Sequence, residues 1–83
     1  MDDTKIYDSS DIQNEYVSQI VKEVAENLSD RGYNPVNQIV GFLMSGDPGY
    51  ISSYKEARSK ISKLDRTKIL EILVENFINK WDI

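Results

Sequence analysis

The sequence predicts an all-α fold, a small four-helix domain preceded by a short N-terminal arm. Apolar residues recur at spacings of three and four in successive segments, which is typical of amphipathic helices. No segment shows the sustained alternation of a strand, and all four glycines and both prolines lie between positions 32 and 49. We therefore expect residues 1–10 to form a mobile, disordered arm and residues 11–83 to form a single helical domain.

The first helix is predicted from Ile12 to about Ser29 or Arg31. Its apolar positions fall on one stripe and comprise Ile12, Tyr16, Val17, Ile20, Val21, Val24 and Leu28. Gly32 is the stop signal, because glycine adopts the left-handed conformation that ends many helices. We expect the ring of Tyr33 to pack into the junction with the next helix.

The second helix, predicted over residues 35–45, has a capping signal at each end. The side chain of Asn34 can accept a hydrogen bond from a backbone N–H of the first turn, and Pro35 suits the first helical position. Ser45-Gly46 closes the helix, and Asp47-Pro48-Gly49 follows as a turn.

Apolar residues nearly encircle this second helix, so we expect it to be central and buried. They are Val36, Ile39, Val40, Phe42, Leu43 and Met44. Gly41 in its middle costs about 1 kcal/mol of helix stability relative to alanine. We therefore expect another backbone to pack closely against Gly41.

A third helix is predicted after a capping box formed by Ser53 and Glu56. It runs through Ala57 and Ile61 to about residue 64. Its apolar face is thin, which predicts that it is the most exposed helix of the four.

Asp65 is the predicted cap of the last helix. The apolar stripe of that helix comprises Ile69, Leu70, Leu73, Val74, Phe77, Ile78 and Trp81. Ile72 falls outside the stripe, and we predict Ile72, Tyr54 and Trp81 as candidates for a subunit interface.

The size of the chain favours association. A core this small rarely supplies more than about 3–5 kcal/mol of net stability. The 83 residues include no cysteine and no histidine, so disulfides are excluded and the commonest metal ligand is missing. We expect no cofactor, and we expect a homodimer. The acidic N-terminus is not a signal peptide and no segment is apolar enough to span a bilayer, which predicts a cytoplasmic protein without membrane insertion.

Charge is distributed unevenly around a net value of −4. Acidic residues dominate positions 1–30, and basic residues dominate positions 55–68. The two regions could attract each other within the fold or across a dimer, or both could be solvated helix faces. The basic residues spread around the helix rather than forming one stripe, so binding of nucleic acid through 55–68 is a less favoured alternative.

Catalysis is not expected. Without histidine or cysteine, no spacing forms a recognisable catalytic constellation. Asp47 is expected to bond to its own backbone in the turn. The glycines at 41, 46 and 49 lack the lysine and the preceding strand of a phosphate-binding loop.

The most distinctive stretch reads GYNPVNQIVGFLMSGDPGYI and is followed by Ala57-Arg58 and Lys63-Leu64-Asp65-Arg66. With these residues the chain resembles the IreB family of small regulatory phosphoproteins from Gram-positive bacteria, from about Tyr16 to Ile78. The residues that carry the motif are Gly32, Tyr33, Asn34, Pro35, Asn37, Gln38, Gly41, Ser45, Gly46, Asp47 and Pro48.

The resemblance implies a non-enzymatic substrate of a membrane-anchored Ser/Thr protein kinase with extracellular PASTA repeats. It also implies a cognate phosphatase, an unknown downstream protein, and a role in cell-envelope stress and antimicrobial tolerance. Family members are phosphorylated on a threonine of the arm, commonly in a Thr-x-x-aromatic pattern, which Thr4 and Tyr7 match. Thr4 is therefore the expected phosphorylation site.

A phosphate on the arm could dock on a basic surface through charge-assisted hydrogen bonds. The candidates are Lys55, Arg58, Lys60 and Lys63. The alternative is a protein-interaction module whose GYNP–SGDP surface binds a partner regardless of phosphorylation.

Overall fold

The computed structural model describes residues 9–81 and contains four α-helices, with no strand in that range. Two short 3₁₀ turns, η1 and η2, connect the second helix to the third. The elements are α1 (Ser9–Asp30), α2 (Pro35–Ser45), η1 (Pro48–Tyr50), η2 (Tyr54–Glu56), α3 (Ala57–Ser62) and α4 (Arg66–Lys80). The prediction of an all-α, four-helix fold is confirmed.

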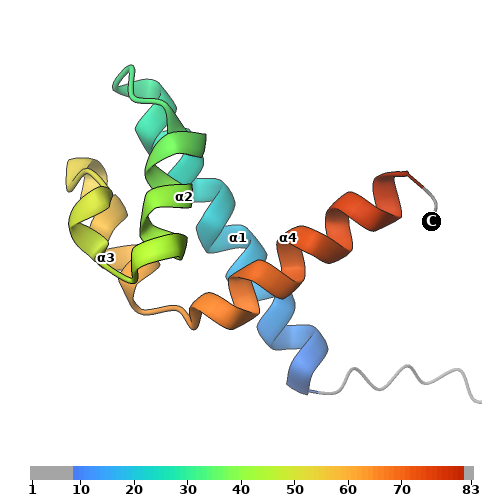
Figure 1. The fold of residues 1–83 in the computed structure, drawn as a ribbon. Helices are drawn as coiled ribbons and strands as arrows, with labels where there is room; N and C mark the ends of the chain where they lie inside the picture. The colour runs from blue at the N-terminus through green and yellow to red at the C-terminus, as the bar shows by residue number, and fades with distance from the viewer. Residues whose placement is uncertain (1–8, 82–83) are drawn as a thin grey trace, which may run out of the picture.

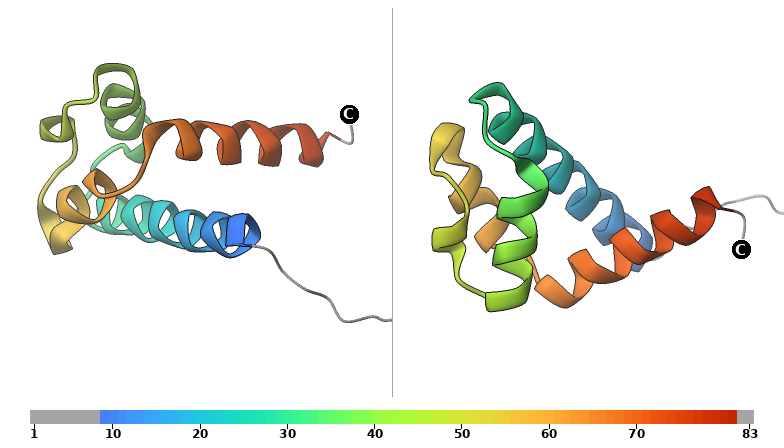
Figure 2. Two further views of the ribbon diagram at one scale, coloured as in Figure 1. Left: turned by 90° about the horizontal axis from the view of Figure 1, so that it is seen from below. Right: turned by 45° about the horizontal axis from the view of Figure 1, so that its top comes forward.

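The long helix α1 is the element against which the other three helices pack (Figure 1). Both α2 and α3 lie along its C-terminal half, whereas α4 crosses it near the middle and extends beyond it (Figure 2). Side chains from all four helices and the α2–α3 connection meet in one core. That core comprises Val17, Val24, Leu28, Phe42, Leu43, Ile51, Ala57, Ile61, Ile69 and Ile72.

Helix α2 has the predicted caps but not the predicted burial. Gly46 ends the helix in the left-handed conformation at φ +79°. Only Phe42 and Leu43 are buried, while Val36 is 67% exposed and Met44 is 81% exposed. The expectation of a central, buried helix is wrong because the fold covers α2 on one side only, and its other apolar side chains remain in solvent.

The packing around Gly41 in α2 and the exposure of Tyr33 just before α2 also differ from the predictions. A Cβ added to Gly41 would lie 2.6 Å from Cδ1 of Tyr50, so the group packed against Gly41 is an aromatic ring rather than a backbone. Tyr33 is exposed instead of filling the junction with α1. Its backbone N–H donates to the carbonyl of Leu28 at 2.9 Å, and Gly32 beside it has φ +87°, so the end of α1 is closed by backbone geometry.

Helix α3 begins later than predicted and is less exposed than predicted. Lys55 and Glu56 adopt left-handed conformations at φ +51° and +66°, and Ser53 makes no side-chain cap bond. A capping box needs a continuous first helical turn, which these two residues interrupt, so that prediction is wrong. Ala57 and Ile61 are fully buried, because α3 lies directly on α1.

Helix α4 is capped as predicted, since the side chain of Asp65 accepts a hydrogen bond from the backbone N–H of Thr67 at 2.9 Å. The residues of α4 that are buried differ from those that were predicted, however. Ile72 is only 7% exposed and belongs to the core, so its assignment to a subunit interface is wrong. The ring of Tyr54 is half-buried, with the cations of Arg31 and Lys55 near it, and its role as an interface candidate stays a prediction.

Candidate interaction surfaces

An extended apolar surface lies on α4. We call it the α4 stripe, and it consists of Leu70, Leu73, Val74, Phe77, Ile78 and Trp81. All six are exposed, and no side chain from position 73 to position 81 is buried. The rings of Phe77 and Trp81 contact each other with their centroids 6.2 Å apart, yet Phe77 is still 62% exposed. Apart from Ile69, which is buried in the core, the residues of the predicted apolar stripe therefore form an open face of a projecting helix.

A second apolar surface lies on α2, and we call it the α2 stripe. Val36, Val40 and Met44 are spaced by four residues and are all at least half exposed. The ring of Tyr50 lies beside them over Gly41 and is exposed as well. The sequence already contained this signal, because residues 35–45 include no charged side chain. Because the helix was predicted to be buried, its apolar residues were not interpreted as an exposed surface.

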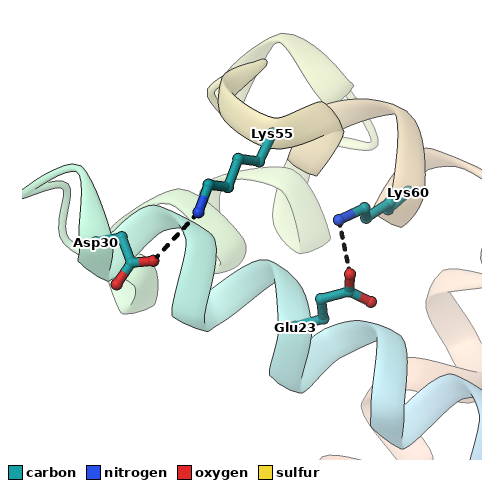
Figure 3. A network of polar contacts seen from close by, with 4 residues as sticks. All are labelled: Glu23, Asp30, Lys55 and Lys60. Carbon is teal, nitrogen blue, oxygen red and sulfur yellow. Dashed lines mark hydrogen bonds and ion pairs between the residues drawn. The ribbon is translucent and has the colours of Figure 1, made fainter.

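Two basic residues, Lys55 of the α2–α3 connection and Lys60 of α3, face the acidic C-terminal half of α1 (Figure 3). Lys60 Nζ lies 2.8 Å from Glu23 Oε2, and Lys55 Nζ lies 3.8 Å from Asp30 Oδ2. Of the alternatives drawn from the charge pattern, attraction within the fold is therefore present at two points. Exposed pairs of this kind each contribute about 0–1 kcal/mol.

The other two predicted docking residues have different surroundings. Arg58 Nε donates to the carbonyl oxygen of Ile51 at 2.8 Å, which fixes the guanidinium against the α2–α3 connection. Lys63 is exposed and forms no ion pair with another residue of the described range 9–81. Lys55 precedes α3, Arg58 and Lys60 lie in it and Lys63 follows it, and two of the four already have acidic partners.

Several residues of the GYNP–SGDP motif hold the backbone in place around α2. The side chain of Asn34 accepts from the N–H of Asn37 at 3.1 Å, and Pro35 is the first helical residue. Gln38 Oε1 accepts from the backbone N–H of Ser52 at 2.8 Å, which joins α2 to the segment that leads to α3.

The second half of the motif forms a hydrogen-bonded turn. The hydroxyl of Ser45 donates to the carbonyl of Gly41 at 2.8 Å and accepts from the N–H of Asp47 at 2.9 Å. The carboxylate of Asp47 in turn accepts from the N–H of Gly49 at 2.8 Å, while Pro48 begins η1. The structural role expected for Asp47 is confirmed.

The structure also bears on the phosphorylation site, on metal binding and on membrane-spanning helices. Thr4 falls outside the described residues 9–81. Within that range, no three acidic side chains come close enough together to form a metal site. In the same part of the chain, no helix combines the length and apolar character needed to cross a membrane.

A comparison with known protein families finds the same family that the motif indicates. A family model described as IreB regulatory phosphoprotein matches residues 2–79, nearly the whole chain. The chain belongs to the IreB family. That match gives this IreB-family protein a regulatory role, and the family description names a phosphoprotein rather than a catalytic activity.

Proposed function

We propose that this IreB-family protein is a non-enzymatic regulatory phosphoprotein that a Ser/Thr protein kinase phosphorylates on Thr4 and a phosphatase dephosphorylates. The observation that carries the proposal is the family match, which spans residues 2–79 and therefore includes Thr4. The cellular context that we propose is cell-envelope stress and antimicrobial tolerance, in the cytoplasm. Thr4 has the Thr-x-x-aromatic spacing to Tyr7 and stands five residues before α1 begins at Ser9.

We propose a second copy of this chain as the partner of the α4 stripe. The stripe repeats at three and four residues over three turns and contains no charged side chain. A patch of this kind is self-complementary about a two-fold axis, so two copies can cover each other in a closed dimer. Contiguous apolar surface is rarely left exposed on a monomer. A domain with a small core also gains stability when a second copy enlarges that core.

The basic surface of Lys55, Arg58, Lys60 and Lys63 is proposed as the binding site for an acidic partner. Arg58 uses one N–H in its bond to Ile51, so its terminal nitrogens remain able to donate. Lys63 projects into solvent. A phosphate or carboxylate that approaches here can form charge-assisted hydrogen bonds without displacing the Lys60–Glu23 pair.

A second candidate function is a protein-interaction module that acts regardless of phosphorylation. The α2 stripe favours this alternative, because its capped, uncharged helix presents three apolar side chains in a fixed line. Binding of nucleic acid is less favoured, since Lys55 and Lys60 already face carboxylates of α1.

The proposal is tested by phosphopeptide mass spectrometry on protein purified from its own cells before and after envelope stress, with phosphatase treatment as a control. We expect one phosphatase-sensitive phosphate on Thr4, lost in Thr4→Ala and retained in Thr67→Ala. Thr67 is the matched control because it lies in the first turn of α4. An arm without phosphate under stress, with a functional kinase present, would contradict the proposal.

A further inference from the structure

The junction between η2 and α3 holds two consecutive residues in the left-handed conformation. Lys55 has φ +51° and ψ +34°, and Glu56 has φ +66° and ψ +21°. The N–H of Ala57 donates to the carbonyl of Tyr54, so these four residues form a type I′ turn, whose central positions are usually Gly, Asn or Asp. A Cβ disfavours the left-handed conformation by about tenfold per residue relative to the right-handed helix. Strain is therefore concentrated at this point of the fold.

The local sequence favours a different structure for the same residues. Lys55, Glu56 and Ala57 include good helix formers. Ser53 and Glu56 have the spacing of a capping box, in which each side chain would satisfy a backbone N–H of the first turn. A helix that begins after Ser53 would be continuous with α3, which ends at Ser62. The observed turn lacks this arrangement, because Ser53 makes no side-chain cap bond.

Contacts with the end of α1 hold the left-handed turn in place. The ammonium group of Lys55 lies 3.8 Å from Asp30 Oδ2 (Figure 3) and 5.5 Å from the centre of the Tyr54 ring. The guanidinium of Arg31 lies 5.2 Å from the centre of the same ring. Exposed ion pairs and cation–ring contacts each favour a conformation by no more than about fivefold. Their combined effect is comparable to the strain of two left-handed residues, so the turn and the helix are close in free energy.

Backbone hydrogen bonds do not decide between the two conformations. In the observed turn, the N–H of Ala57 is bonded to Tyr54, and that of Arg58 donates to the carbonyl of Ser52 at 3.1 Å. In a continuous helix, both N–H groups would donate to the carbonyls four residues earlier. The buried side chains of Ile51 and Ala57 anchor the chain on either side, so the change is confined to the residues between them.

A buried donor on α1 adds a second cost at this place. Asn27 is 8% exposed, and its Nδ2 has no hydrogen-bond partner among residues 9–81. It lies four residues after Glu23, which pairs with α3, and four residues before Arg31, which contacts η2. Asn27 is therefore on the face of α1 that the junction covers. A buried polar group without a partner destabilises the conformation that leaves it so.

The two conformations present the basic residues differently. In the turn, the ammonium group of Lys55 faces Asp30. In a continuous helix, Lys55 and Arg58 would be three residues apart and would lie on one face. The bond from Arg58 to Ile51 uses Nε, so its terminal nitrogens can still donate. An anion that binds both cations therefore favours the helix, and a difference in affinity of this kind is what shifts an equilibrium.

We propose that the η2–α3 junction is a two-state switch, in which Lys55 and Glu56 convert from the left-handed turn into the first turn of a longer α3, driven by an acidic ligand on Lys55 and Arg58. The ligand-driven part rests on the acidic partner of the proposed function, whereas the equilibrium between turn and helix is a property of the free protein. The ligand displaces Asp30 from Lys55. Binding at the basic surface thus loosens the contact between η2 and the end of α1.

Nuclear Overhauser effects in the full-length protein distinguish the two conformations. A positive φ gives a strong effect between the HN and Hα protons of Lys55 and of Glu56, whereas the helix gives an effect between Lys55 Hα and Arg58 Hβ. Asp30→Asn removes the ion pair that holds Lys55 and should raise the ratio of helix to turn by about twofold. An unchanged ratio in Asp30→Asn would overturn the proposal.

Glycine at position 56 tests the strain. Glycine adopts the left-handed conformation without a Cβ penalty, so Glu56→Gly should raise the midpoint of thermal unfolding. The matched control is Ser59→Gly at an exposed position within α3, which should lower the midpoint because glycine disfavours a right-handed helix. A lower midpoint for both variants would show that Glu56 is not strained and would overturn the proposal.

An octaglutamate peptide serves as the acidic probe. Its addition should weaken the intraresidue effects at Lys55 and Glu56 in the wild type and in Lys63→Gln, but not in Glu56→Gly, where glycine retains the turn. If the peptide shifts the amide signal of Arg58 while the turn persists, the ligand-driven switch is overturned and the basic surface stands. If no signal of the basic surface shifts, the acidic partner of the proposed function fails together with the ligand-driven step, and Asp30→Asn alone decides whether the equilibrium exists.

Discussion

The guanidinium of Arg66 donates from Nη1 to the carbonyl oxygen of Leu43 at 2.9 Å, so the first residue of α4 satisfies a carbonyl in the last turn of α2. The last four carbonyls of a helix have no partner within the helix, and Leu43 is among them. A Cβ added at Gly46 would lie 2.9 Å from Cζ of Arg66, so glycine also makes room for this contact. One side chain therefore joins the C-terminal end of α2 to the start of α4.

Arg66→Ala should lower the free energy of unfolding by about 1–2 kcal/mol, because a charged hydrogen bond to a partly buried carbonyl is lost. Urea denaturation followed by circular dichroism measures the change. Lys63→Ala is the control and should change stability by no more than about 0.5 kcal/mol, since its side chain is exposed. Equal effects of the two substitutions would show that the bond to Leu43 does not stabilise the fold.

Gly41→Ala should destabilise the protein by about 1–3 kcal/mol, as expected for an overpacked contact. The added Cβ would lie 2.6 Å from the ring of Tyr50, and this clash outweighs the helix propensity of alanine, which alone favours the substitution by about 1 kcal/mol. Thermal unfolding gives the sign of the effect.

The matched test for Gly41 uses the background Tyr50→Ala, in which the ring is absent. There Gly41→Ala should be neutral or stabilising, and the two single substitutions should be strongly non-additive. If Gly41→Ala destabilises both backgrounds equally, the Tyr50 ring is not the cause.

Phe77→Ser should weaken a dimer formed through the α4 stripe, because it removes an apolar side chain that is 62% exposed in the single chain. Sedimentation velocity over a range of concentrations should show the wild-type dimer converted toward monomer. Met44→Ser on the α2 stripe is the control, being even more exposed, and should leave the dimer unchanged. A wild-type chain that sediments as a monomer at every concentration would refute the assignment of the partner.

The Lys60–Glu23 pair should contribute a small coupling energy, about 0.5 kcal/mol, in a double-mutant cycle of Lys60→Gln and Glu23→Gln. The side chains are partly exposed, so the coupling should decrease as salt is added. The longer Lys55–Asp30 pair, at 3.8 Å and with both side chains more than half exposed, should show coupling near zero. A larger coupling energy for Lys55–Asp30 than for Lys60–Glu23 would show that distance and exposure do not determine the strength of these pairs.

The local signals in the sequence were sufficient for most of the helix ends, the start of α3 excepted. Asn34, Gly46 and Asp65 act on groups within a few residues of themselves, so their roles follow from the chain alone. The same holds for the turn at Asp47, whose carboxylate bonds to a backbone N–H two residues away. The family motif could also be recognised from the sequence, since much of it consists of these capping and turn residues.

Which faces are covered was decided only by the tertiary structure. Helical periodicity shows that Ile72 and Phe77 lie on different faces of α4, but not which face meets α1. The ring over Gly41, the left-handed turn at Lys55 and Glu56, and the bond from Arg66 to Leu43 all depend on where distant segments meet. Sequence by itself therefore determined the helices and most of their ends, because those interactions are local, whereas the start of α3 was not among them. The three-dimensional packing decided which apolar side chains form the core and which remain exposed for a partner.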